Sequence, residues 1–66
     1  MVVSSEIEWI GYERKKQMLQ VEFIAGSIYQ YEPVPETVYQ DFLNAPSHTR
    51  FFEGEVKNRF PHRKIR

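Results

Sequence analysis

The sequence predicts an α+β fold, in which a three-stranded antiparallel β-meander is followed by two helices packed on one face of the sheet (βββαα). Apolar and polar residues alternate through much of the first half of the chain, as they do in half-buried strands. Pro33 and Pro35 then interrupt any strand ladder, and beyond them apolar residues recur at helical spacing. The 66 residues leave room for one domain, residues 1–66, because a chain this short cannot build a second core.

The three expected strands lie at residues 7–12, 18–23 and 27–32, and the charged run between the first two is expected to form a loop. The apolar faces fix the register of the second hairpin. A three-residue loop that ends at Gly26, in the left-handed conformation, places Leu19 opposite Tyr31 and Val21 opposite Tyr29. This register gathers the apolar residues of both strands on one face.

The first helix is expected over residues 36–44, with Pro35 at its first position and Val34 packing against Val38 as a hydrophobic staple. A second helix is expected to begin with Ser47 as its N-cap. Its apolar residues recur every four positions until Pro61 ends the helix; they are Phe52, Val56 and Phe60. The ordered part of the domain is expected to cover residues 4–61, with residues 62–66 as a frayed basic tail.

Composition argues against several functional classes. The chain has no cysteine, which excludes thiol catalysis and cysteine-ligated metal sites and is typical of a reducing cytoplasm. Its two histidines, His48 and His62, have no carboxylate at ligand spacing, and its three glycines form no phosphate-binding loop. It has no run long and apolar enough for a signal peptide or a membrane span. We therefore expect a cytoplasmic protein that is not an enzyme and has no cofactor, no metal and no small-molecule substrate.

The charges are unevenly distributed although the net charge is zero. Residues 1–33 carry five acids and three bases (net −2), whereas residues 34–66 carry four acids and six bases (net +2). Basic residues could neutralise RNA phosphates, although such runs are more often simply solvated. Arg50 and Lys57 are seven apart and should share the polar face of the second helix. The candidate nucleic-acid-binding residues are Arg14, Lys15, Lys16, Arg50, Lys57, Arg59, Arg63 and Lys64.

Two groups of apolar residues allow different interpretations. Tyr29 and Tyr31 could form a stacking platform for bases, but the register places them beside Leu19 and Val21, which favours a position in the core. The opposite sheet face has no element left to cover it, so its apolar side chains could bind a protein partner or a second copy of the chain. These side chains are Trp9, Met18, Ile24 and Ile28.

Taken in order, several short motifs of the chain resemble the KTSC domain, a family named for a C-terminal extension of some lysyl-tRNA synthetases that also occurs as small free-standing proteins. The resemblance runs from Ser4 to about Pro61. It implies an RNA-binding role by analogy with the synthetases. The chain departs from the family pattern at Thr49, where a glycine is usual, and at His62, where an aromatic residue often follows the proline. The motifs are Ser4-Ser5, Ile10-Gly11-Tyr12, the alternation Leu19-x-Val21-x-Phe23, Gly26, Tyr29-x-Tyr31, Val34-Pro35, Val38-Tyr39, Phe42, Ala45-Pro46-Ser47, Phe51-Phe52 and Phe60.

The sequence thus supports two functional hypotheses. The leading one is a non-enzymatic module that binds RNA, tRNA-like in kind, through a basic helix face and the basic tail. The alternative is a protein-interaction module, an adaptor, a small inhibitor of a larger enzyme or a homodimer, that uses the sheet face of Trp9 and Ile28.

Overall fold

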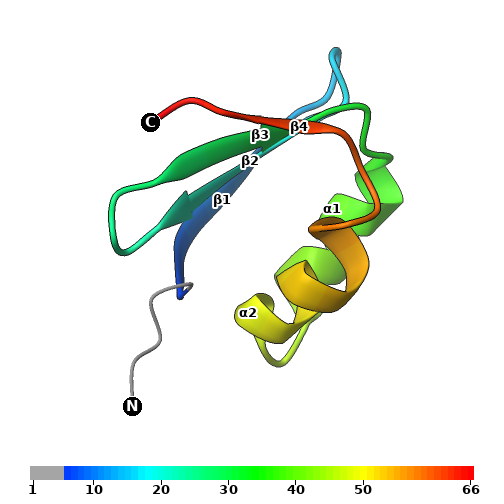
Figure 1. Ribbon diagram of the computed structural model, residues 1–66. Helices are drawn as coiled ribbons and strands as arrows, with labels where there is room; N and C mark the ends of the chain where they lie inside the picture. Colours follow the sequence, from blue (N-terminus) through cyan, green and yellow to red (C-terminus); the bar gives the residue numbers. More distant parts are fainter. Residues whose placement is uncertain (1–5) are drawn as a thin grey trace.

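The computed structural model of the chain describes residues 6–66. Over this range an antiparallel sheet forms one layer, and helices lie against one of its faces (Figure 1). The sheet contains, in chain order, β1 (Ile7–Glu13), β2 (Met18–Phe23), β3 (Ile28–Tyr31) and β4 (His62–Lys64). The helical layer contains α1 (Glu36–Asn44), α2 (His48–Phe51) and a π-helical turn, η1 (Phe52–Val56), that continues α2. The predicted α+β class is confirmed.

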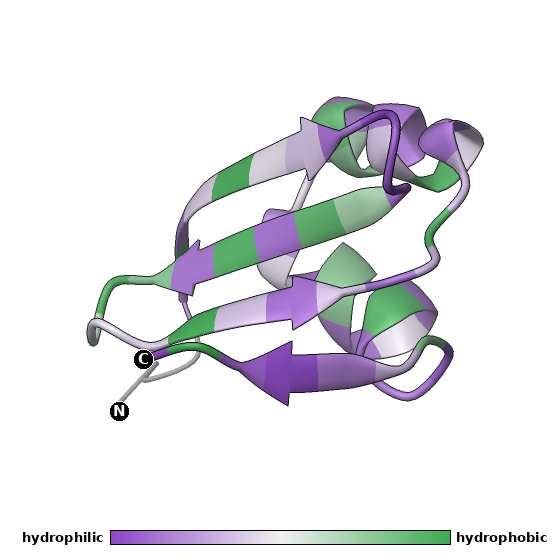
Figure 2. Ribbon diagram, turned by 90° about the horizontal axis from the view of Figure 1, so that it is seen from above, coloured by the Kyte–Doolittle hydropathy of each residue, from purple (hydrophilic) through white to green (hydrophobic). Residues whose placement is uncertain are grey.

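The second hairpin has the predicted register. Leu19 lies opposite Tyr31, and Val21 lies opposite Tyr29. Gly26, in the connecting loop, has a φ of 107°, a conformation that side chains rarely adopt. Apolar and polar residues alternate along β2, as the alternating colours of that strand in Figure 2 show. The strand therefore presents one face to the helices and the other to solvent.

The core lies between the sheet and the helices, on the face of the sheet predicted to be apolar. Val34, in the segment that joins β3 to α1, is completely buried, and Val38 of α1 packs against this core. Tyr12 of β1 donates a hydrogen bond from its hydroxyl to the carbonyl of Val34 (2.5 Å). Eight of the residues that the structure describes are buried: Leu19, Val21, Phe23, Tyr31, Val34, Phe42, Phe52 and Val56.

The first helix begins and ends where the sequence predicts, although Pro35 is its N-cap rather than its first helical residue. Ser47 is the N-cap of α2, as expected, and its hydroxyl accepts a hydrogen bond from the backbone N–H of Arg50 (3.3 Å). The second helix is shorter than predicted and widens into η1, in which the N–H of Lys57 donates to the carbonyl of Phe52 (2.8 Å). Four-residue spacing exceeds the 3.6 residues of an α-helical turn, so a wider turn keeps the apolar residues on one side.

The prediction of a three-stranded sheet with a frayed tail is wrong, because residues 62–64 form β4 at the edge of the sheet beside β3. The pairing extends beyond the strand: the N–H of Ile65 donates to the carbonyl of Ile28 (2.7 Å). Without β4, the polar backbone groups of β3 would lie at an open sheet edge. The strand is hydrophilic throughout in Figure 2, so it has no apolar alternation that would have predicted it. Residues 4 and 5 of the expected ordered range lie outside the described residues.

Candidate nucleic-acid interface

A hollow of about 350 Å³ opens between the β3–β4 edge of the sheet and η1. Its floor is aromatic and buried, formed by Phe23, Tyr31 and Phe52. Ligand sites in proteins typically combine apolar walls with a few polar groups, in volumes of roughly 300–1,000 Å³. The hollow is at the small end of that range, which suits one small planar group. Its other lining residues are Ser27, Tyr29, Glu53, Lys57, Asn58 and His62.

The pairing of β3 with β4 places aromatic and basic side chains together on the helix-facing side of the sheet edge. Tyr31 lies opposite His62, and Tyr29 lies opposite Lys64. Cross-strand partners point to the same side of a sheet, so all four lie on the side of the hollow. The His62 ring centroid is 5.1 Å from that of Tyr31 and 5.8 Å from that of Tyr29. The half-buried ring of Tyr29 and the exposed ring of His62 therefore continue the aromatic floor outward to solvent.

Tyr31 is the aromatic residue that joins this hollow to the core. Its side chain is only 2% exposed and makes an edge-to-face contact with Phe52, with ring centroids 5.7 Å apart. Burial, with a smaller contribution from Tyr29, raises the pKa of Tyr31 to about 12. The phenol is therefore neutral at physiological pH. The sequence interpretation that placed Tyr31 in the core is confirmed, whereas Tyr29 is only half-buried and borders the hollow.

Two of the predicted basic residues lie near the hollow, one just after η1 and one on β4. Lys57 lines it from the end of η1, and Lys64 reaches the same side of the sheet as the cross-strand partner of Tyr29. Arg63 lies between His62 and Lys64, so strand alternation turns it to the opposite face. There its guanidinium is 3.4 Å from the side-chain carbonyl of Gln30.

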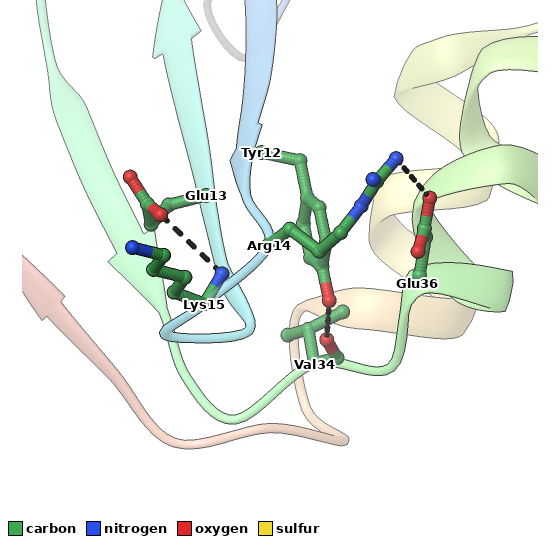
Figure 3. Close-up of polar contacts among 6 residues, drawn as sticks. All are labelled: Tyr12, Glu13, Arg14, Lys15, Val34 and Glu36. Atoms are coloured by element: carbon green, nitrogen blue, oxygen red, sulfur yellow. Dashed lines mark hydrogen bonds and ion pairs between the residues drawn. The ribbon is translucent and has the colours of Figure 1, made fainter.

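The other predicted basic residues lie elsewhere. Arg14 forms an ion pair with Glu36 of α1 (3.0 Å), as Figure 3 shows, and the backbone N–H of the neighbouring Lys15 donates to the carboxylate of Glu13 (3.3 Å). Lys16 is exposed in the same turn. An ion pair thus links this turn to α1, and none of its three basic residues lines the hollow.

The two remaining helix cations also lie away from the hollow. Arg59 is paired with Glu55 one turn earlier (3.4 Å). Arg50 borders a separate depression beside Pro46 and Phe51, whereas Lys57 borders the hollow. Arg50 and Lys57, which were expected to share a polar face, thus border different depressions, and the π-helical turn η1 lies between them in the chain.

Trp9 lies flat on the outer face of the sheet. A Cβ atom at Gly11 would come within 2.3 Å of the Trp9 ring, so the absence of a side chain at Gly11 makes room for the indole. The indole remains 51% exposed. Ile28 and Met18 are partly exposed on the same face, and Ile24 is 61% exposed in the β2–β3 turn. All four side chains predicted to form an apolar partner-binding surface are thus at least partly accessible.

The outer face is nevertheless dominated by polar and acidic groups. A ladder of side-chain hydrogen bonds crosses it, in which Gln30 donates to Gln20 and Gln20 donates to Glu22 (both 3.0 Å). Strand alternation also brings Glu13 and Glu32 to this face. A negative surface of this kind repels phosphates. The two faces of the sheet edge therefore differ in the ligands they favour.

Among residues 6–66 there is no group of three or more histidine and acidic side chains arranged to hold a metal ion. In the same part of the chain no helix is both long enough and apolar enough to cross a membrane. The pattern of aromatic residues did not predict the hollow, because helical and strand spacing shows which rings face inward and not whether the two layers close over them. His62 was missed as a site residue for the same reason that β4 was missed.

Comparison with known proteins finds relatives that are similar in sequence and in fold. A sequence model described as the KTSC domain matches residues 3–60. In the crystal structure of a KTSC domain protein from Yersinia pestis, the chain is 45% identical and the TM-score is 0.86, over 98% of this chain and 92% of that one. A protein of Tsukamurella paurometabola is 46% identical over 59 residues, which cover 89% of this chain and 88% of the relative.

Larger proteins contain a matching segment. A lysine--tRNA ligase of Nostoc punctiforme is 43% identical over 56 residues, and the aligned region covers 85% of this chain but 10% of the ligase. The chain spans about a tenth of such ligases and most of the shorter relatives. The same domain thus occurs both as a small protein and within a larger one.

Proposed function

The chain belongs to the KTSC domain family, and on this premise we propose that it is a non-enzymatic module that binds single-stranded RNA along the β3–β4 edge of its sheet. The observation that carries the proposal is an aromatic hollow lined by Lys57, with Lys64 on the same side of the sheet edge as the cross-strand partner of Tyr29. Proteins that bind single strands combine cations, which neutralise phosphates, with aromatic rings, on which bases stack.

The charge of the two sheet faces supports this orientation of the RNA. The outer face carries Glu13, Glu22 and Glu32 against Arg63, whereas the side of the hollow carries Lys57, Lys64 and the exposed His62 against Glu53. Phosphates are attracted to the second group and repelled by the first. The basic tail thus contributes to binding as an ordered strand, with Lys64 at the hollow and Arg63 on the other face.

The relatives give a second line of support. In three of them, the matching segment is about a tenth of a lysine--tRNA ligase, an enzyme whose name states that it acts on tRNA. A module carried by such an enzyme would add affinity for RNA through a second, tethered contact. We extend this role to the present chain as a proposal, for unpaired segments of tRNA-like RNA.

The test is a titration of an unstructured RNA octamer, followed by fluorescence anisotropy at several salt concentrations. If two phosphates are neutralised, the logarithm of the affinity falls with the logarithm of salt concentration at a slope of about −1.4. The double variant Lys57→Glu/Lys64→Glu should lose at least tenfold in affinity and most of this slope.

The matched control is Lys15→Glu/Lys16→Glu, which changes the net charge by the same amount in a turn that does not line the hollow. It should weaken binding much less. Equal losses in the two double variants would show attraction to net charge without a site. Absence of binding by the native chain at low salt would refute the proposal.

A second candidate function, capture of a protein partner on the outer face, is favoured by the exposed position of Trp9 over Gly11. The surrounding acids disfavour a second copy of the chain, since two such faces would repel one another. They favour a partner that presents lysine or arginine side chains, which also bind well over an indole face.

This candidate is tested with a purified partner obtained by affinity capture from lysate. Trp9→Ala should abolish binding of that partner and Trp9→Phe should retain most of it, while Lys57→Glu/Lys64→Glu should leave it unchanged. If Trp9→Ala binds the captured protein as the native chain does, the outer face is not the interface.

A further inference from the structure

We infer that the hollow holds one unstacked nucleobase of the bound strand, with Tyr29 as its stacking ring and with its phosphate outside, at Lys57 and Lys64. This inference rests on the proposed function and adds to it a specific subsite. A protein that bound RNA only through its phosphates would need the cations and not the hollow. The two possibilities therefore differ in what the base itself contributes.

The shape and lining of the hollow suit a planar ring. At about 350 Å³ it is small for a ligand site, and its floor consists of buried aromatic side chains. Water that lies against this aromatic floor forms few hydrogen bonds with it, so an apolar face that displaces this water gains affinity. A nucleobase offers two flat faces for the rings and a polar edge for the groups at the rim.

Tyr29 is the ring best placed to stack on a base. Tyr31 is 2% exposed and Phe52 is 4% exposed, so both form the floor. Tyr29 is half-buried and is held from behind by an edge-to-face contact with Phe23, with centroids 5.8 Å apart. His62 lies next to it on the solvent side. A ring that neighbouring rings already hold in place loses little entropy when a base binds.

The charges at the rim orient the nucleotide. Glu53 lines the hollow, and its carboxylate disfavours a phosphate inside. Lys57 also lines the hollow, and Lys64 lies on the same side of the sheet edge. The base therefore enters first, and the phosphates stay outside beside the ammonium groups.

The decisive experiment changes the RNA and leaves the protein intact. Binding of an RNA octamer is compared with binding of an abasic octamer that has the same number of phosphates. Stacking of one base is worth about 5- to 150-fold in affinity, so the abasic strand should bind at least fivefold more weakly at the same salt concentration. Equal affinities, both lowered by salt, would overturn the base subsite and leave the proposed function standing. Binding of neither strand would overturn the proposed function itself.

Two variants of the protein identify the ring. Tyr29→Leu should lower affinity for the octamer about tenfold and leave affinity for the abasic strand unchanged, whereas Tyr29→Phe should bind both strands as the native chain does. Unfolding by urea checks that Tyr29→Leu remains folded. An equal loss for both strands would assign the effect of Tyr29→Leu to altered structure, and a loss with Tyr29→Phe would assign binding to the hydroxyl. Either result would overturn the stacking role.

Two further measurements test whether the ligand is RNA or a free nucleotide, and which face of the sheet it binds. Adenosine monophosphate carries the same base and phosphate chemistry as one nucleotide of RNA, and it should bind at least tenfold more weakly than an adenine octamer; equal affinity would make the hollow a site for free nucleotides. The chain has one tryptophan, Trp9, on the outer face. Its emission should not change when RNA fills the hollow, and a saturable change that tracks binding would place the RNA on the wrong face.

Discussion

At the scale of single residues, Tyr31 links the stability of the fold to the candidate site. Its ring belongs to the core, yet it also forms the floor of the hollow and contacts His62. Because burial holds its pKa near 12, the phenol can ionise in the folded state only at high pH. The pH dependence of stability therefore reports on this position.

We expect the free energy of unfolding to decrease between pH 10 and pH 12 because of Tyr31. The unfolded chain loses this proton near the ordinary pKa of 10.0, whereas the folded chain keeps it until about 12. The stabilising contribution is complete below pH 10 and is lost as pH rises through the folded pKa, a change of up to ~2 kcal/mol. Urea unfolding at several pH values measures it.

The control is Tyr31→Phe, which keeps the ring and removes the proton. The other titrating groups are common to both proteins, so the difference between their pH profiles isolates Tyr31. Superimposable profiles from pH 9 to pH 12 would contradict the prediction.

Single residues also show how much of the structure could be predicted from the sequence. Alternation was enough to assign Tyr31 to the core, because it reports the direction of each side chain. It could not show that Tyr29, on the same face, would border a hollow, since this depends on how far η1 stands from the sheet. The contact of Trp9 with Gly11 was equally hidden, because a pattern of residue types does not specify a rotamer.

At the scale of elements, β4 has the largest structural consequence. It covers the edge of β3, places His62 in the lining of the hollow and turns Lys64 to the same side of the sheet. Its side chains are all exposed, so its stability comes from backbone hydrogen bonds and from the contact of His62 with the tyrosines. We therefore expect removal of this strand to lower the free energy of unfolding more than its polar composition would suggest.

Deletion of residues 62–66 should therefore lower the free energy of unfolding by about 2–4 kcal/mol. The deletion removes ladder bonds such as Ile65 N–H to Ile28 C=O (2.7 Å) and Ile28 N–H to Arg66 C=O (3.1 Å), each of which contributes ~1 kcal/mol net. Urea unfolding measures the change. Substitution of Arg63 and Lys64 by threonine, which preserves the backbone, should cost less than 1 kcal/mol. A tail that can be deleted with no effect on stability would be frayed in solution.

The elements that were predicted share strong local signals. The first helix combines an apolar face with prolines before and after it, and the second hairpin combines alternation with Gly26, so tertiary contacts had little to add. β4 and η1 lacked such signals. The first forms only because β3 offers an open edge, and the second forms because Phe52 and Val56 must both reach the core.

At the scale of the whole molecule, zero net charge conceals two faces of opposite sign. Glu13, Glu22 and Glu32 lie on the outer face of the sheet, and Lys57 and Lys64 lie beside the hollow. Two ion pairs of the described region, Arg14–Glu36 and Arg59–Glu55, are exposed at the surface. Exposed pairs contribute little to stability. Charge in this molecule therefore contributes little to the stability of the fold.

This distribution of charge predicts that added salt weakens RNA binding but leaves the stability of the fold almost unchanged. Raising sodium chloride from 0.05 to 0.5 M should change the free energy of unfolding by less than ~0.5 kcal/mol, because the ion pairs are weak and already screened. Over the same interval the affinity for an RNA octamer should fall about 25-fold, if two phosphates are neutralised. Urea unfolding and anisotropy, performed in the same buffers, measure both quantities. A loss of stability that accounts for the loss of binding would mean that salt acts on the fold, and the cations beside the hollow would then have no separate role.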